Sequence, residues 1–579
     1  MDNKKTLQKI LNNQQLHHSS FYVADWRIEP DTLCIFHASS EIKLEPKVMQ
    51  VLVYLASKPG EVIKREELES NIWAGRVVGY DALANTIIKL RKAFGDSSRH
   101  PQFIKTIPKT GYQLIAKVEQ SLSEPAKPLD KEMHHPEKIK ITPLKHYKLK
   151  LIMIGMLLFL VPLVWFWQTI EKPFLNQEQQ EITTSFDKPS IAVLPFLNVS
   201  GPVQEYFSDG ITEDLITDLS KIQGLTVVAR NSVFTYKGST DNEQTIGREL
   251  GVHYVLKGSI QKSMNRMRIN VQLTSVTDGR NLWAERYDRD LGDIFQIQDE
   301  LAAHIVSAMQ IKLAPADQQR LSRNYIAGVE AYDEFLKGLE HYGRRSLDSS
   351  LLAKAHFRNA IELDPEFARA YAALALAYSR DSIDGWDFSV NQSLDQAYTL
   401  AQQALQLDAS IPQLYFVMSQ VKLSQRDYTA AIKNIEKAIV LNSSYADAYA
   451  LLGWVLHFAG RPNEGLEVMQ RAIRLNPGVP AVYRLVSGSI YYALGKSDKA
   501  IKMLREGAEI NPGFQQIRVW LAAAYVSAGL MEEAQWEVAE ILTMNPDFSL
   551  KSVETFFPFH DPLYRDRFIA DLNKAGLSY

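Results

Sequence analysis

Apolar positions in residues 21–118 change from strict alternation to helical spacing and then back to alternation. Short alternating runs surround "WRIEPDTLCIF", whereas "EPKVMQVLVYLASKPG" and "KREELESNIW" carry helical spacing. A third helix is predicted from Asp81, an expected N-cap, through "ALANTIIKLRKAF" to the terminating Gly95. The run "QFIKTIPKTGYQLIA" then contains two apolar-rich strands around a tight turn. The pattern predicts a small domain in which three helices precede a hairpin.

The third predicted helix has two distinct faces. Its apolar side chains recur at core spacing: Leu83, Ile87, Leu90 and Phe94. Another face carries Asp81, Asn85, Lys89 and Lys92. An amide and two cations suit a helix that enters the DNA major groove, because amides bind adenine edges and cations bind guanine edges or phosphates. From this helix alone, an ordinary solvated face is an equally good interpretation.

A long apolar run interrupts the polar pattern between residues 151 and 170. These 20 residues carry no charge, and a helix of that length crosses a hydrocarbon core of about 30 Å. Lysines crowd the upstream flank at positions 138, 140, 145, 148 and 150, which predicts a cytoplasmic N-terminus. A buried core helix is the alternative. We expect a single-pass protein with its C-terminal part on the far side of the membrane.

Residues 190–315 alternate between strand and helix patterns. "SIAVLPF" predicts a buried strand, "YFSDGITEDLITDLSKIQG" an amphipathic helix closed by Gly224, and "LTVVAR" a further strand. The helix contains Asp209, Glu213 and Asp214, which could form a metal site. Acids in the first turn of a helix are explained more simply by the helix dipole, so no metal is expected. The region is predicted to be a mixed α/β module.

A repeat begins near residue 332 and continues to residue 546. Six acidic or amide residues mark successive helix ends at intervals of 44, 34, 34, 35 and 34: Asp364, Asp408, Asn442, Asn476, Asn511 and Asn545. A 34-residue helix-turn-helix period is typical of tetratricopeptide repeats. The longer interval indicates a 10-residue insert near "SRDSIDGWDF", and residues 547–579 are predicted to cap the array. Tyr483, Tyr491, Tyr492 and Tyr525 are interpreted as inter-helix packing rather than as groove residues.

Charge and motifs narrow the function classes. Residues 1–150 carry a net charge of +7 and the rest of the chain −10, an asymmetry consistent with a polyanion partner for the first part. The single cysteine, Cys34, excludes a disulfide within the later domains. Residues 119–147 have four prolines and no apolar period, which predicts a flexible linker. No P-loop, HExxH, CxxC, GxSxG or dinucleotide motif is present, so we expect neither an enzyme nor a cofactor.

The segment "NIWAGRVVGYDALANTIIKLRKAFGDSSRHPQFIKTIPKTGYQL" closely resembles the winged helix-turn-helix of OmpR-type bacterial response regulators. This resemblance implies that Asn85, Thr86 and Lys89 approach bases, that Arg91 and Lys92 support phosphate contact, and that Lys109 lies at the wing tip. The implied DNA-binding set is Asn85, Thr86, Lys89, Arg91, Lys92, Lys105, Thr106, Lys109 and Tyr112. Ile88 departs from the family, which often has a cation at that position.

The segments "IAVLPF", "FSDGITEDLI", "VVAR" and "LWAERYDRD" resemble the TolB-like α/β module. Together the parts resemble the ToxR/CadC-like membrane-spanning transcription regulators. The resemblance implies a one-component regulator that binds double-stranded promoter DNA, self-associates, and senses a periplasmic protein or small molecule. It also implies that the membrane is the bacterial inner membrane and that the C-terminal part is periplasmic. The alternative is an envelope assembly scaffold whose repeats bind proteins. The predicted fold is multidomain α/β and all-α: winged helix-turn-helix, one transmembrane helix, mixed α/β module and tetratricopeptide-repeat solenoid.

Overall fold

The structure is a computed structural model. The structure describes residues 20–37, 40–72, 81–96, 101–107, 111–120, 186, 188–201, 204–263, 266–311, 328–344, 346–384 and 390–579. The predicted membrane helix at 151–170 and the predicted linker beyond residue 120 lie outside these ranges. Among the helices that the structure describes, none is both long enough and apolar enough to span a bilayer.

The N-terminal domain contains two small antiparallel sheets. The first has the strand order β4-β3-β2-β1-β8 and the second β5-β7-β6. The strands are β1 (Phe21–Val23), β2 (Trp26–Glu29), β3 (Cys34–His37), β4 (Ser40–Lys43), β5 (Val62–Lys64), β6 (Ile104–Ile107), β7 (Gly111–Leu114) and β8 (Val118–Gln120). The predicted alternating runs and the hairpin are confirmed. Because β8 pairs with β1 through Gln120, the folded domain continues two residues into the predicted linker.

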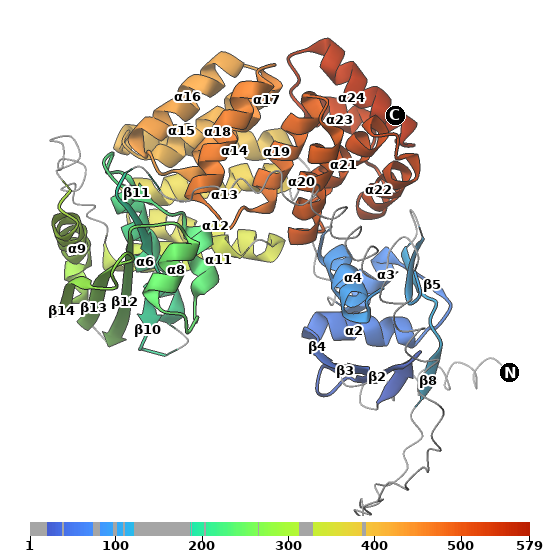
Figure 1. The fold of residues 1–579 in the computed structure, drawn as a ribbon, viewed down its shortest axis with the longest axis horizontal. Helices are drawn as coiled ribbons and strands as arrows, with labels where there is room; N and C mark the ends of the chain where they lie inside the picture. The colour runs from blue at the N-terminus through green and yellow to red at the C-terminus, as the bar shows by residue number, and fades with distance from the viewer. Residues whose placement is uncertain are drawn as a thin grey trace, which may run out of the picture. The chain divides into compact units, whose positions relative to one another are not determined.

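Three helices of this domain share one hydrophobic core with both sheets (Figure 1). They are α2 (Pro46–Ala56), α3 (Arg65–Ile72) and α4 (Asp81–Phe94). Asp81 is thus the first residue of α4, not the N-cap that the sequence predicted. The predicted core stripe is confirmed, because Leu83, Ile87 and Leu90 are at most 1% exposed and Phe94 is 4% exposed.

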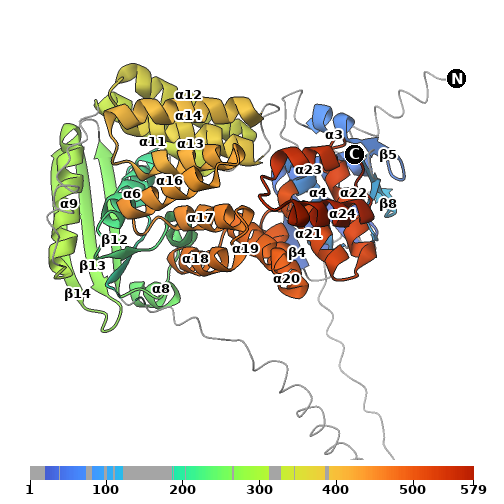
Figure 2. The same cartoon turned by 90° about the horizontal axis from the view of Figure 1, so that it is seen from above.

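The α/β module is built on a mixed sheet with the strand order β11-β9-β12-β13-β14. Strands β11, β9 and β12 are parallel, whereas β12, β13 and β14 form an antiparallel meander. Helix α9 lies along β14, as Figure 2 shows. The elements are β9 (Ser190–Val193), β10 (Leu197–Asn198), α6 (Glu205–Ser220), β11 (Thr226–Val227), α7 (Arg230–Val233), α8 (Glu243–Glu249), β12 (Tyr254–Ser263), β13 (Arg266–Ser275), β14 (Asn281–Asp290) and α9 (Ile294–Ala308).

Two details of this module differ from the sequence prediction. Helix α6 ends at Ser220 with Lys221 as its C-cap, so Gly224 does not close it. The backbone then makes short turns at Ile222 and Leu225 before β11. Strand β11 contains only two residues of the predicted run "LTVVAR", and Arg230 begins helix α7.

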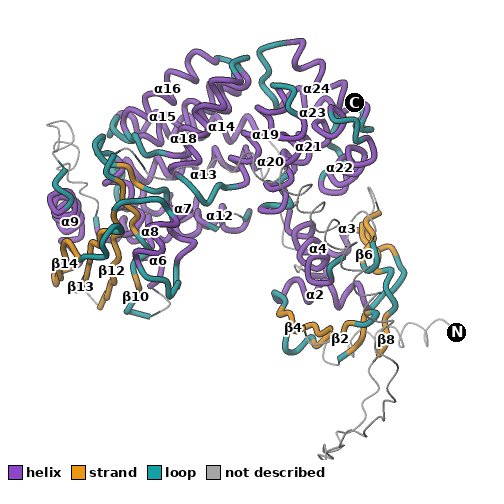
Figure 3. The backbone as a smooth tube through the Cα atoms, viewed as in Figure 1, coloured by secondary structure: helices purple, strands orange, loops and turns teal. Residues whose placement is uncertain are grey.

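The repeat region consists of antiparallel helix pairs (Figure 3). The helices are α11 (Val329–Gly343), α12 (Leu347–Leu363), α13 (Ala368–Asp384), α14 (Val390–Leu407), α15 (Pro412–Ser424), α16 (Tyr428–Leu441), α17 (Ala446–Phe458), α18 (Pro462–Leu475), α19 (Ala481–Ala493), α20 (Ser497–Ile510), α21 (Gln515–Ser527) and α22 (Met531–Met544). Each of the six predicted helix-end residues directly follows the second helix of a pair, which confirms the repeat register.

Eight of the extra ten residues of the long interval lie in the two helices of one pair. Helix α13 has 17 residues where α15 and α17 have 13, and α14 has 18 where α16 and α18 have 14. The insert therefore lengthens two helices by about one turn each.

The predicted capping tail forms two helices, α23 (Leu550–Phe556) and α24 (Pro562–Lys574). Helix α24 packs on α21, where Trp520 contacts Phe557, Phe559 and Phe568 with ring centroids 4.2–6.1 Å apart. Tyr483, Tyr492 and Tyr525 are at most 3% exposed, and Tyr491 packs half-buried against the core, which confirms the predicted packing role. Tyr483 also lines a cavity in the repeat region.

Candidate nucleic-acid interface

Helix α4 presents cations on the side opposite its apolar stripe. Lys89 and Lys92 are exposed, and both follow the spacing that places them away from the core. Asn85 lies in α4, but its side chain is outside the described residues. Of the four residues on the predicted DNA-facing side of this helix, the structure therefore describes the side chains of the two lysines, Lys89 and Lys92.

The ammonium of Lys89 is held by a carboxylate from another element. Its Nζ lies 2.7 and 2.8 Å from the two carboxylate oxygens of Glu45, which precedes α2. Both side chains are more than half exposed, at 53% for Lys89 and 64% for Glu45. Glu45 was not predicted from the sequence as part of this surface. The sequence feature that could have identified it is a glutamate at the N-cap position of a helix, where short polar residues are preferred.

Arg91 connects α4 to the wing rather than pointing into solvent. It is 5% exposed, and its guanidinium donates to the Ile104 carbonyl at 3.0 Å and to the Thr106 hydroxyl at 2.7 Å. Thr86 is 6% exposed, so its side chain also lies mostly in the interior. These two side chains pack α4 into the domain in this structure. Little of their surface is exposed for the base and phosphate contacts that were predicted for them.

The turn after α4 fixes the start of the wing. Gly95 has φ +65°, a conformation that favours glycine. The carboxylate of Asp96 then accepts from the backbone amides of Gln102 at 2.7 Å and Ile104 at 2.8 Å. Together with Arg91, these bonds tie β6, the first strand of the wing, to the end of the predicted recognition helix.

The wing strands display a mixture of exposed and buried predicted residues. Lys105 on β6 is exposed, Thr106 is half-buried, and Tyr112 on β7 is 4% exposed. Lys109, at the predicted wing tip, lies outside the described residues. Gly111 is required for close approach, because a Cβ there would lie 2.0 Å from the Ile63 carbonyl oxygen of β5. The hairpin is thus pressed directly against the strand that leads into α3.

A polar cluster joins the first two helices of this domain. Tyr54 of α2 donates to Glu67 of α3 at 3.0 Å, and Lys58 forms an ion pair with the same carboxylate. The hydrogen bond from Lys58 lowers the pKa of Glu67, and the bond to Glu67 raises the pKa of Lys58. Both groups therefore stay charged around neutral pH, and their ion pair connects α3 to the turn that follows α2.

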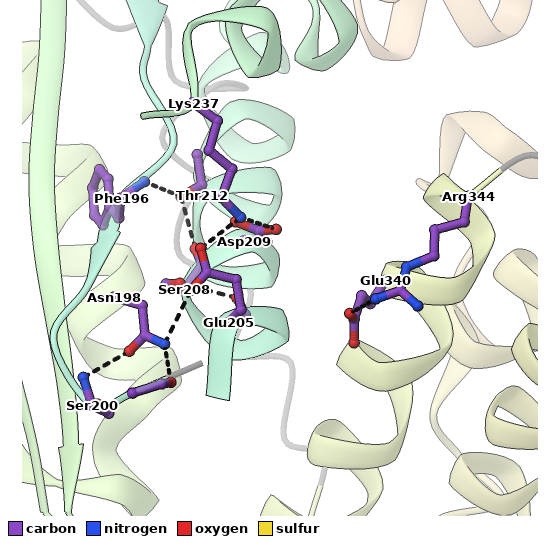
Figure 4. Close-up of polar contacts among 11 residues, drawn as sticks. Phe196, Asn198, Ser200, Glu205, Ser208, Asp209, Thr212, Lys237, Glu340 and Arg344 are labelled. Atoms are coloured by element: carbon purple, nitrogen blue, oxygen red, sulfur yellow. Dashed lines mark hydrogen bonds and ion pairs between the residues drawn. The ribbon is translucent and has the colours of Figure 1, made fainter. Parts of the chain in front are cut away.

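The acids of α6 are partnered by cations, so the helix-dipole interpretation was wrong. Helix α6 begins at Glu205, which leaves Asp209, Glu213 and Asp214 beyond its first turn. Figure 4 shows Lys237 reaching Asp209, with Nζ 2.6 Å from its carboxylate. Arg230 lies 2.8 Å from Glu213. Among the described residues there is no group of His, Cys, Asp or Glu that could hold a metal ion.

Asp214 joins the α/β module to the first repeats. It is 1% exposed, forms an ion pair with Arg369 of α13, and accepts a hydrogen bond from Tyr332 of α11 at 2.5 Å. Gln298 of α9 donates to the same carboxylate at 3.3 Å. Burial and the Asp214 charge raise the pKa of Tyr332 well above its usual range, so this hydroxyl remains a donor. The two regions also share one hydrophobic core.

A cavity of about 460 Å³ is the second candidate site. Its walls come mainly from the first helix of each repeat pair, and α7 contributes Arg230 and Asn231. Trp454 and Phe416 supply partly exposed aromatic rings. The Arg380 guanidinium stacks over the Tyr342 ring at 3.5 Å and donates to the Tyr342 carbonyl at 2.5 Å. The volume is in the range of small-molecule sites.

The domain types are those of a transcription regulator. Residues 39–114 match the family model of the C-terminal domain of transcriptional regulatory proteins, and residues 187–304 match the second domain of HilA/YgeH-like transcriptional regulators. Residues 416–480 and 491–552 match tetratricopeptide repeat models. The N-terminal domain is therefore a winged helix of the DNA-binding type, and the helix pairs are tetratricopeptide repeats.

Three relatives extend these matches. The chain is 24% identical to the transcriptional activator CadC of Escherichia coli over 525 residues, which cover 82% of this chain and 98% of CadC. It is 42% identical to the cholera toxin transcriptional activator of Vibrio cholerae over 88 residues, 15% of this chain and 30% of that protein. It is 46% identical over 233 residues to "Putative adenylate cyclase 3" of Rhizobium meliloti, 40% of each chain. The chain is thus similar to regulators of the CadC, ToxR and HilA type.

Proposed function

We propose that this chain is a one-component transcription regulator of the inner membrane. In this proposal the winged helix binds double-stranded promoter DNA, and the α/β module, of TolB-like type, senses an envelope signal together with the repeats. The observation that carries the proposal is the joined unit of α4 and β6, the first strand of the wing, which hydrogen bonds of Arg91 and Asp96 hold together. Such a unit can place a helix in the major groove and a hairpin beside it.

The proposed membrane location rests on the sequence. Residues 151–170 are uncharged, and five lysines precede them. These features support a span with a cytoplasmic N-terminus and a periplasmic C-terminus. Alkaline phosphatase fused after residue 185 should then be active, and a fusion after residue 120 should be inactive. The reverse pattern would overturn the proposed orientation.

Signal transfer across one helix is proposed to occur through association. Two copies whose exported parts pair would hold their winged helices at roughly millimolar effective concentration, which favours binding to tandem half-sites. The 460 Å³ cavity is where we place a small-molecule signal, because both α7 and the repeat helices line it. A small molecule bound in the cavity would contact both the α/β module and the repeats, the two regions that Asp214 connects.

The test of DNA binding uses the full chain with Lys89→Ala and Asn85→Ala. Loss of one good base contact should reduce discrimination between selected and scrambled duplexes by about 1–3 kcal/mol. Affinity should fall steeply with salt, since phosphate neutralisation releases counterions. Glu41→Gln, an exposed change on β4, is the matched control. If Lys89→Ala and Asn85→Ala both discriminate selected from scrambled duplexes as well as wild type does, the proposed DNA-binding surface is refuted.

The second candidate is an envelope scaffold, which the long repeat array favours because such arrays present extended binding surfaces. A scaffold would need no sequence-specific DNA binding, so the duplex assay separates the two functions. We propose no enzymatic activity. The cyclase-named relative matches over only 40% of its own length, which leaves most of that protein without a counterpart here.

A further inference from the structure

Glu45 occupies the N-cap of α2 without acting as a cap. Its backbone is extended at φ −68° and ψ 150°, and its side chain makes no capping hydrogen bond. Instead the carboxylate turns to α4 and accepts two hydrogen bonds from Lys89 Nζ, at 2.7 and 2.8 Å. The side chain therefore contacts the predicted recognition helix at Lys89, 44 residues further along the chain, instead of capping α2.

The pair is a surface feature with little value for stability. Lys89 is 53% exposed and Glu45 is 64% exposed, and ion pairs at such exposure contribute little to folding. The same exposure leaves both charged groups open to a duplex. Any base edge or phosphate that Lys89 Nζ contacts would also lie close to the Glu45 carboxylate.

The Lys89–Glu45 ion pair complements a G·C base pair better than it complements the DNA phosphate backbone. In the major groove guanine offers two adjacent acceptors, O6 and N7, which suit an ammonium, and the paired cytosine offers an N4 amino donor, which suits a carboxylate. A phosphate presents only acceptors and a negative charge, so Glu45 repels it. A repulsive group of this kind raises specificity by weakening the wrong complex.

We propose that Glu45 is a specificity-determining residue of the DNA interface. Its carboxylate suppresses contact between Lys89 and phosphates, and accepts a hydrogen bond from the cytosine opposite the guanine that Lys89 contacts. This inference rests on the proposed DNA binding. It adds a role for an acidic residue on the predicted base-reading surface.

The experiment compares wild type, Glu45→Gln, Lys89→Gln and the double variant as full chains. Each selects duplexes from a randomised pool, and each is titrated with a scrambled duplex at several salt concentrations. Glu45→Gln should lose the preference for one G·C pair by at least about five-fold. Its salt slope on scrambled DNA should steepen by about 0.9, the value for one added phosphate contact.

The double variant distinguishes a direct role from a general charge effect. When Lys89 is already Gln, Glu45→Gln should change the selected sequence and the salt slope less than it does in wild type. The reason is that the two residues act as one unit. Glu41→Gln is the control for loss of an exposed carboxylate, and unchanged thermal unfolding verifies that each variant is folded. An unaltered motif and slope in Glu45→Gln would overturn the inference while DNA binding stands. Failure of wild type to bind any duplex would overturn both proposals.

Discussion

His457 should make the repeat region sensitive to acid. This side chain on α17 is 1% exposed and lies among aromatic rings, with centroids 5.4 Å from Trp520 and 5.6 Å from Tyr564. Its Nε2 is 3.5 Å from the Tyr564 hydroxyl, and Nδ1 is buried without a hydrogen-bond partner in the described chain. Burial lowers the pKa of His457 to about 3, so the folded protein keeps the ring neutral.

In the unfolded chain His457 has its usual pKa of 6.5, well above its pKa in the folded protein. The free energy of unfolding is therefore at its full value above pH 6.5 and decreases as the pH falls toward 3. Linkage gives a loss of about 2 kcal/mol at pH 5 and about 4 kcal/mol at pH 3 from this one side chain. His457→Phe keeps an aromatic ring but cannot bind the proton. Its stability should therefore depend less on pH.

Urea unfolding followed by tryptophan fluorescence at pH 7.5, 6 and 5 measures this difference, because Trp454 and Trp520 contact the histidine ring. The difference between variants is the quantity of interest, since a chain with several domains need not unfold in two states. His560→Asn changes an exposed histidine and is the control. Parallel loss of stability in wild type and His457→Phe between pH 7.5 and 5 would refute the reasoning.

Three further predictions concern buried contacts. Arg91→Ala should lower the unfolding free energy of the winged helix by about 1–3 kcal/mol, because it removes the buried bonds to Ile104 and Thr106, and unchanged circular dichroism melting would contradict this. Arg369→Ala should destabilise the α/β module and the first repeats by about 3–5 kcal/mol because it removes the cation that partners the buried Asp214 carboxylate, and Asp214→Asn together with Arg369→Ala should recover part of that loss in urea unfolding. Gly453→Ala should cost about 1–3 kcal/mol, since a Cβ would lie 2.9 Å from Met469 and 3.2 Å from the Gly465 carbonyl oxygen, whereas Gly328→Ala, with no atom within 4 Å, should be nearly neutral in the same assay.

Local periodicity determined much of the architecture. The apolar stripe of α4 was predicted because helical spacing places residues 83, 87, 90 and 94 on one face, and all four are buried. The repeat register followed in the same way from helix-end residues at a nearly constant interval, and each of them ends a helix in the structure. These features depend on neighbours within a few turns, so the sequence contains them directly.

Contacts between distant residues were decided only by the tertiary structure. Asp214 is 155 residues from Arg369, and Glu45 is 44 residues from Lys89. Because no local pattern encodes which cation meets which carboxylate, neither the partners of the α6 acids nor the contact of Glu45 with Lys89 was predicted. The burial of Thr86 and Arg91 was also decided at this level, since the position of the wing relative to α4 determines which polar side chains of one helix reach solvent.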